Sequence, residues 1–152
     1  MRAGEDSDEA FEEFLELWRR LYRANRDDGA VILVEGERDR RALTRLGLEG
    51  GIELVHRGTT LATTAQRLLD GHRTVILLTD WDPEGGNLAR RLRGLLQAGG
   101  VRLDLEYRRR LARILRGEVV HVEGLHGWTR RMAERHGMTI AELLERLRAE
   151  AP

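Results

Sequence analysis

The sequence predicts an α/β fold, in which a mainly parallel sheet of about four strands is flanked by helices. Two short apolar runs, 30–34 and 75–79, are each followed by acids and then by a helical pattern. Unbroken apolar runs of this length are typical of parallel strands that are covered on both faces. An amphipathic pattern before the first run predicts an extra N-terminal helix, and helical patterns after residue 105 predict a helical C-terminal tail.

Acidic residues follow the second run at single-residue spacing. Asp80, Asp82 and Glu84 come directly after it. In an extended loop alternate side chains point to the same side, so these three acids are expected to converge while Trp81 points away. Mg²⁺ binds near-octahedral oxygen ligands, usually one or two carboxylates with waters and substrate phosphates. The motif therefore indicates a magnesium site at the carboxyl end of a strand.

A capping role explains part of the same motif. Asp82 before Pro83 is a good helix N-cap with proline at the first helical position, and Glu84 suits the positive end of a helix. Taken alone, the motif is compatible with both interpretations.

The first run repeats this design. Strand 30–34 leads into Glu35 and Gly36, and Asp39 lies one helical turn further on. If the two strands are neighbours in a parallel sheet, Glu35 lies near Asp80. Ligands of such sheets bind outside the carboxyl ends of the strands, where the strand order reverses.

These two motifs resemble the Toprim domain, which topoisomerases, bacterial primases, some nucleases and recombination proteins share. The resemblance covers about residues 30–105, and it rests on the sequence 34–36 with Asp39 and on the sequence 79–85, which looks like the DxDxEG form of the family. Two motifs in the right order, about forty residues apart, are far more specific than either alone. The resemblance implies a Rossmann-like Toprim fold.

The resemblance also implies roles for the acids. Glu35 would act as a general acid or base or share a metal ion, Asp80 and Asp82 would hold Mg²⁺, for which Mn²⁺ can substitute, and Glu84 matches a third acid of some members. Supporting residues are Gly36, Asp39 and Gly85. Asp39 is equally explained as a first-turn residue that complements the helix dipole. A close phosphate or a tight contact between helix and strand would each explain Gly85.

Composition limits the other classes of function. The 152 residues suit one domain, and 26 basic and 26 acidic residues cancel, so attraction to nucleic acid depends on local patches. All basic residues are arginine, which excludes the lysine of a P-loop and a Schiff-base lysine. The absence of cysteine excludes disulfides and thiol catalysis. No apolar run reaches membrane-spanning length, so a cytoplasmic protein without membrane contact is the default expectation.

Three segments organise the chain: 1–29, the core 30–105, and a C-terminal extension 106–152. The first segment holds a helix that starts near Asp6. Its apolar stripe would pack on the sheet or on another subunit, so a dimer through this helix is one expectation. The stripe comprises Phe11, Phe14, Leu15, Trp18, Leu21 and Tyr22. Further helices are expected over 38–46, 61–69, 85–97, 106–116, 124–136 and 139–149. Further strands are expected over 52–55 and 101–105, with a short one over 118–122.

Basic residues near the acidic end of the sheet are candidates for nucleic-acid contact. The candidates are Arg57, Arg90, Tyr107, Arg108, Arg109, Arg110 and Arg113. Arg57 follows strand 52–55 in a polar turn, where Thr59 or Thr60 is expected to cap the next helix. Segment 106–116 is the strongest basic cluster, in which arginines would follow a backbone while Tyr107 stacks on a base. A solvated helix face is the alternative explanation.

No catalytic motif is evident in the C-terminal extension. His121 and His126 lie five apart, and not the four that would align them on one helix face. For all five histidines, namely His56, His72, His121, His126 and His136, surface or structural roles are preferred to metal binding.

The function expected from these residues is magnesium-dependent phosphodiester chemistry on nucleic acid. Topoisomerases need a strand-cleaving tyrosine and large gate domains, and primases need a zinc module that contains cysteine. The sequence has the features of neither class. By length and layout the chain is closest to the small primase-like group, similar to the bacterial endonuclease that matures ribosomal RNA. Its expected activity is that of a small Toprim nuclease acting on structured RNA or DNA. The alternatives are a non-catalytic nucleic-acid-binding or scaffold protein and a partner-dependent nucleotidyl-transfer subunit.

Overall fold

The computed structural model describes residues 3–55, 60–71 and 74–150, and it has the predicted α/β architecture. Its strands are β1 (Val31–Val34), β2 (Ile52–Leu54), β3 (Thr74–Leu77) and β4 (Arg102–Asp104). Its helices are α1 (Ala3–Arg26), α2 (Glu37–Arg45), α3 (Leu61–Gly71), α4 (Pro83–Leu96), α5 (Glu106–Leu115), α6 (Leu125–Arg135) and α7 (Ile140–Glu150), with short 3₁₀ turns at Gln97–Gly99 and Val122–Gly124. None of the described helices is long and apolar enough to cross a bilayer.

The four strands form one parallel sheet in the order β2-β1-β3-β4. The chain runs from β1 outward to β2 and then returns across β1 to begin β3 on its other side. The strand order therefore reverses between β1 and β3, and the carboxyl ends of these two neighbours flank the reversal. This adjacency confirms the expectation from the two acidic motifs.

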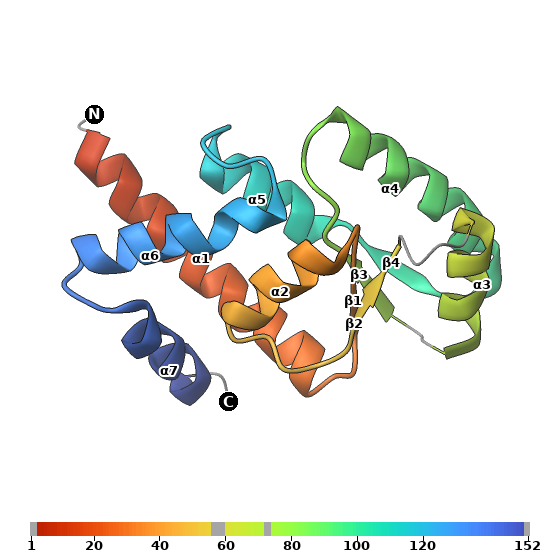
Figure 1. Cartoon of the computed structure of the whole chain (residues 1–152), viewed down its shortest axis with the longest axis horizontal. Coiled ribbons are helices and arrows are strands. Elements are labelled where there is room, and N and C mark those ends of the chain that lie inside the picture. The colour runs from red at the N-terminus through yellow and green to blue at the C-terminus, as the bar shows by residue number, and fades with distance from the viewer. Residues whose placement is uncertain (1–2, 56–59, 72–73, 151–152) are drawn as a thin grey trace.

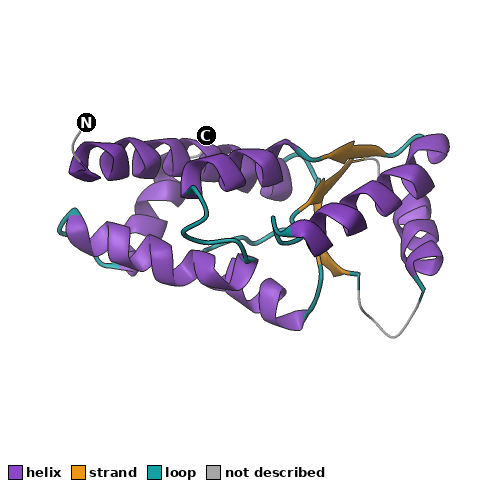
Figure 2. Ribbon diagram, turned by 90° about the horizontal axis from the view of Figure 1, so that it is seen from above, coloured by secondary structure: helices purple, strands orange, loops and turns teal. Residues whose placement is uncertain are grey.

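Helices cover both faces of the sheet (Figure 1). Seen from above, α3 and α4 lie on one side of the strands, and the remaining helices lie on the other (Figure 2). Alternate strand residues point to opposite faces. One face packs Ile32, Val34, Leu54, Ile76 and Leu78 against α1, α2 and α5, and the other packs Val31, Leu33, Val75 and Leu77 against α3 and α4. The two strand runs are apolar throughout because each face has its own core.

The apolar stripe of α1 is buried within the chain. All of its six predicted residues are at most 7% exposed. Trp18 Nε1 donates to the carbonyl of Leu46 at 3.2 Å, and the ring of Phe14 lies 5.0 Å from that of Trp128, edge to face. The stripe is therefore not free to form the expected dimer, because α2, α5, α6 and α7 already cover it. The helix also begins earlier than expected, at Ala3.

Residues 118–122, all of which the structure describes, do not form the short strand expected there. The backbone groups of this segment instead bond to the loop after β3: the carbonyl of Val120 accepts the N–H of Trp81 at 3.1 Å. A 3₁₀ turn, Val122–Gly124, follows. Val119 and Val122 of this segment are buried in the core on the α1 and α2 side of the sheet.

Asn25 connects the end of α1 to the start of the sheet. Its side chain is 3% exposed and makes three hydrogen bonds to backbone groups. Its amide nitrogen donates to the carbonyls of Ala30 and Gly51 at 2.9 and 3.0 Å, and its amide oxygen accepts the N–H of Gly50 at 2.8 Å. One buried amide thus holds together the segments that enter β1 and β2.

We predict that Asn25→Ala lowers the free energy of unfolding by about 2–3 kcal/mol, because it removes three hydrogen bonds from the backbone groups of Ala30, Gly50 and Gly51. For a chain of this size the melting temperature should fall by roughly 5–10 °C. Thermal unfolding followed by circular dichroism measures the change. Asn87→Ala is the matched control, because Asn87 is exposed on α4 and its loss should leave stability nearly unchanged. Equal melting of the two variants would contradict the role of Asn25.

Candidate metal and phosphate site

The loop after β3 directs two carboxylates outward from the carboxyl edge of the sheet. Asp82 has an extended backbone and caps α4, its Oδ1 accepting the N–H of Gly85 at 2.8 Å. The capping interpretation of Asp82 is thus confirmed, and it occupies only one of the two carboxylate oxygens. Asp80 is similar, because its Oδ1 accepts the N–H of Val122 at 2.8 Å.

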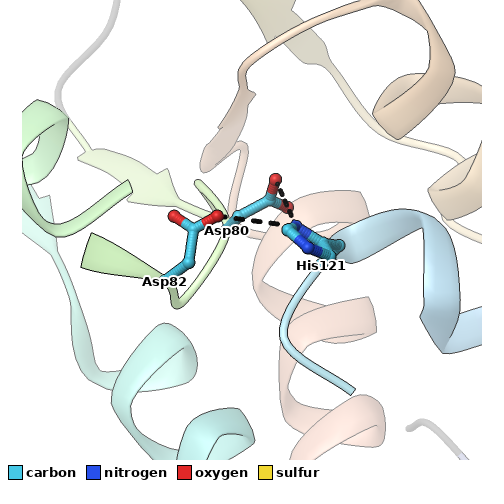
Figure 3. Close-up of side chains that lie close together, drawn as sticks. All are labelled: Asp80, Asp82 and His121. Atoms are coloured by element: carbon cyan, nitrogen blue, oxygen red, sulfur yellow. Dashed lines mark hydrogen bonds and ion pairs between the residues drawn. The ribbon is translucent and has the colours of Figure 1, made fainter. Parts of the chain in front are cut away.

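The second oxygens of both aspartates face a histidine from the C-terminal extension (Figure 3). His121 Nδ1 lies 3.1 Å from Asp80 Oδ2 and 3.6 Å from Asp82 Oδ2. The hydrogen bond to Asp80 is the main cause that raises the pKa of His121. Among the described residues, Asp80, Asp82 and His121 form a set whose ligand atoms all lie within 4.8 Å of one another.

Glu35 lies beside this set at the carboxyl end of β1. Its pKa is raised to about 7, first by burial and then by the negative charges of Asp80, Asp39 and Asp82, and a hydrogen bond to Asp80 adds to the shift. Carboxylates this close do not readily ionise together. The expectation that neighbouring strands bring Glu35 near Asp80 is confirmed, although Glu35 is not one of the three mutually close donors.

Asp39 supports the start of α2. Its side chain is 8% exposed, and Oδ2 accepts the N–H of Gly36 at 3.1 Å. Burial is the main cause that raises its pKa, and the bond from Gly36 opposes the shift. This contact matches the interpretation of Asp39 as a residue of the first helical turn. Gly36 itself has an extended backbone, and a side chain there would meet no atom within 4 Å.

Arg108 braces the acidic loop from α5. Its guanidinium donates to the carbonyl of Asp80 at 2.8 Å and to that of Thr79 at 3.2 Å, with a longer contact of 3.4 Å to Asp82. Burial lowers its pKa, whereas the charges of Asp82, Glu35 and Asp80 oppose that shift. Arg108 therefore places a half-buried positive charge beneath the cluster of acids.

Gly85 allows α4 to start directly against the strand. A Cβ at this position would overlap the carbonyl oxygen of Asp80. The buried hydroxyl of Thr79 donates to the carbonyl of Gly85 at 3.1 Å, which holds the same contact from the other side. Of the two explanations for this glycine, the structure supports the close contact between helix and strand.

Glu84 does not join the two aspartates. The alternation of side chains needs an extended backbone, and α4 begins at Pro83, so the pattern ends at Asp82. Glu84 is consequently exposed in the first helical turn. Trp81 does point away as expected, and its Nε1 donates to the carbonyl of Val119 at 2.5 Å.

The predicted nucleic-acid contacts divide into exposed and buried residues. Arg90, Arg109 and Arg113 are exposed, and Arg110 is half-buried. The Tyr107 ring is 7% exposed and belongs to the core beneath α1, so the expectation that it stacks on a base is wrong. Arg57 lies outside the described residues, whereas Thr60 caps α3 by accepting the N–H of Thr63 at 3.2 Å.

His121 is the site residue that the sequence did not identify. It lies 41 positions after Asp80, outside both acidic motifs. Spacing rules for metal ligands apply within one element, and His121 reaches the site through tertiary contacts of its neighbours. The one signal in the sequence is the set of valines around His121, because apolar residues on both sides of a polar one indicate a segment that packs against the core.

Comparisons with known proteins place the acidic motifs in a family. The Toprim domain matches residues 30–114. A UPF0292 protein of Methanosarcina barkeri is 37% identical over 109 residues, covering 72% of this chain and 76% of that protein, and one of Thermococcus gammatolerans is 37% identical over 119 residues, covering 78% and 85%. A solved structure of a protein from Aquifex aeolicus shares 30% identity, with a TM-score of 0.58, and covers 71% of this chain and 94% of that chain. The matched domain includes Glu35, Asp80 and Asp82 but ends before His121.

We predict that Gly85→Ala lowers the free energy of unfolding by about 1–3 kcal/mol, because the added methyl group has no space beside the Asp80 carbonyl. Gly94→Ala in the same helix is the matched control. A Cβ there meets nothing within 4 Å, so alanine should raise stability by about 0.5–1 kcal/mol. Chemical denaturation measures both changes, and effects of the same sign would contradict the packing argument.

Proposed function

The chain belongs to the Toprim family, and from this premise we propose that it is a magnesium-dependent nuclease acting on structured RNA or DNA. Membership in the family indicates a metal-binding, nucleic-acid-related function. The observation that supports the nuclease most directly is the meeting of Glu35, Asp80 and Asp82 at the strand-order reversal between β1 and β3.

The carboxylates present suit a hard divalent ion. Asp80 and Asp82 each keep one oxygen to which no described backbone amide donates, and these two oxygens face the same point. Mg²⁺ usually takes one or two protein carboxylates and fills its other positions with waters and substrate phosphates. Two available oxygens in a half-buried loop fit this pattern.

Each residue of the site has a distinct task in phosphodiester cleavage. The bound ion would stabilise negative charge that develops on phosphate oxygens. Glu35, beside Asp80, would hold or transfer a proton at its carboxylate oxygen. Arg108 keeps the acidic loop in place through its backbone carbonyls. Arg90 is an exposed cation near the guanidinium of Arg108, on the helix that Asp82 caps, where it is positioned to contact a phosphate.

The nuclease is tested by cleavage of structured RNA, single-stranded DNA and duplex DNA with Mg²⁺ or Mn²⁺. We expect wild-type protein to cleave at least one substrate, and Asp80→Asn and Glu35→Gln to lose about 100-fold or more of the rate. In the Asp80→Asn variant the new amide oxygen can still accept the Val122 N–H, so this variant should fold. Asp70→Asn, which removes an exposed carboxylate at the end of α3, is the matched control and should retain the rate.

The outcomes separate the nuclease from its alternatives. Cleavage that needs metal and disappears in both site variants supports the proposal, and the preferred substrate identifies its biological class. Full activity in Asp80→Asn would overturn it. Binding of nucleic acid without cleavage would instead indicate a binding or scaffold protein, or a nucleotidyl-transfer subunit that depends on a partner.

We predict that Arg90→Ala weakens nucleic-acid binding about equally for different sequences and lowers the slope of log affinity against log salt by about one. A phosphate contact has this effect, because one fewer counterion is released. Binding titrations at several salt concentrations measure the slope. Arg130→Ala, which removes an exposed arginine on α6, is the control and should leave the slope unchanged. An unaltered slope in Arg90→Ala would remove Arg90 from the interface.

A further inference from the structure

We propose that His121 is a metal ligand, so that the site offers one imidazole nitrogen and two carboxylate oxygens and prefers a first-row transition ion such as Mn²⁺ to Mg²⁺. The inference rests on the metal site of the proposed function, but it needs no cleavage. It adds to that site a donor from a segment beyond the matched Toprim domain, which ends at residue 114.

The three donor atoms are free of competing bonds from the backbone groups that the structure describes. Backbone amides of Val122 and Gly85 occupy the Oδ1 atoms of Asp80 and Asp82, and both Oδ2 atoms face His121 Nδ1. The aspartates are therefore fixed with one oxygen each directed at the same nitrogen (Figure 3). Such hydrogen bonds from backbone amides orient the carboxylates in the way that outer-shell partners orient metal ligands.

The distances from the histidine nitrogen to the two aspartate oxygens are close to those between donors around a single ion, and all three donor atoms lie within 4.8 Å of one another. Metal bonds of about 2.1 Å separate neighbouring donors by about 3.0 Å in octahedral geometry and by about 3.4 Å in tetrahedral geometry. The Nδ1 of His121 lies 3.1 Å and 3.6 Å from the two aspartate oxygens. An ion can thus be accommodated with small shifts of the side chains.

Hydrogen bonds on both sides of His121 fix its backbone beside the acidic loop. Before it, the carbonyls of Val119 and Val120 accept the indole and backbone N–H groups of Trp81 at 2.5 and 3.1 Å. After it, the N–H of Val122 donates to Asp80. These hydrogen bonds join segment 119–122 to the acidic loop itself, so the backbone of His121 is held there by contacts other than those of its ring.

An ion pair between His121 and the aspartates is the simpler explanation of the same contacts. The His121 side chain is 56% exposed, however, and a pair at that exposure contributes little to stability. The nitrogen donor distinguishes the metal hypothesis from an ion pair, because it predicts which metal ions the site prefers. Imidazole binds first-row transition ions, and among these Mn²⁺ also suits the carboxylate and water ligands of this site. Mg²⁺, in contrast, is held mainly by oxygen and keeps several waters.

Pulsed electron paramagnetic resonance of the Mn²⁺-loaded protein tests the proposal directly. We expect modulation from a coordinated ¹⁴N nucleus in wild type and its loss in His121→Ala. Titration should show that His121→Ala weakens Mn²⁺ binding by roughly 10- to 100-fold, since removal of even an outer-shell partner has an effect of this size. Mg²⁺ affinity should change less. His126→Ala, which removes a histidine outside the set of donors, should retain both the modulation and the affinity.

The results distinguish this inference from the nuclease. Mn²⁺ bound to wild type without ¹⁴N modulation would overturn the role of His121, even if Mg²⁺-dependent cleavage is found. Modulation that His121→Ala abolishes would support the ligand, even if no nucleic acid is cleaved. Equal losses of Mn²⁺ and Mg²⁺ affinity in His121→Ala would contradict the preference for a transition ion.

Discussion

Asp80 is the point on which the rest of the site depends, because its side chain and its backbone each connect the sheet to a different element. Its carboxylate accepts the Val122 N–H, and its carbonyl accepts the guanidinium of Arg108. The negative charges of Asp80, Asp82 and Glu35 repel one another at one edge of the sheet, as the raised pKa of Glu35 indicates, and these donors offset part of that repulsion. Backbone amides and one half-buried cation thus make the convergence of acids compatible with a folded protein.

The C-terminal half of the chain is therefore part of the site as well as part of the core. Helix α5 delivers Arg108 beneath the acidic loop, while its apolar face, including Tyr107 and Leu111, packs under α1. The segment after α5 returns to the same loop through Trp81. The packing of α1 against α5 and α6 consequently helps to position Arg108 and His121 at the edge of the sheet. Helix α1 itself contributes no residue to the site.

The sequence predicted the parts of this arrangement that depend on local pattern. Unbroken apolar runs identified β1 and β3, and the acids at their ends predicted that Glu35 and Asp80 would meet. Interpretation failed where tertiary context decided the outcome. Burial turned Tyr107 away from solvent, and segment 118–122 forms an anchored loop where a short strand was expected. Glu84 differs from these, because the capping pattern of Asp82 and Pro83 already indicated locally that a helix begins before it. The placements of Tyr107 and of segment 118–122 depend on contacts across long stretches of sequence, which periodicity does not encode.

The position of His121 also changes how metal binding relates to folding. An ion held by residues of the strand-end loop alone would stabilise that loop. An ion that also binds His121 joins the sheet edge to the segment leading into α6, so its binding energy adds to the stability of the C-terminal helices. The bonds from Trp81 and Val122 already hold this segment in the metal-free fold, which limits the ordering that binding requires. The same contacts that orient the ligand thus favour affinity, because little conformational entropy remains to be lost.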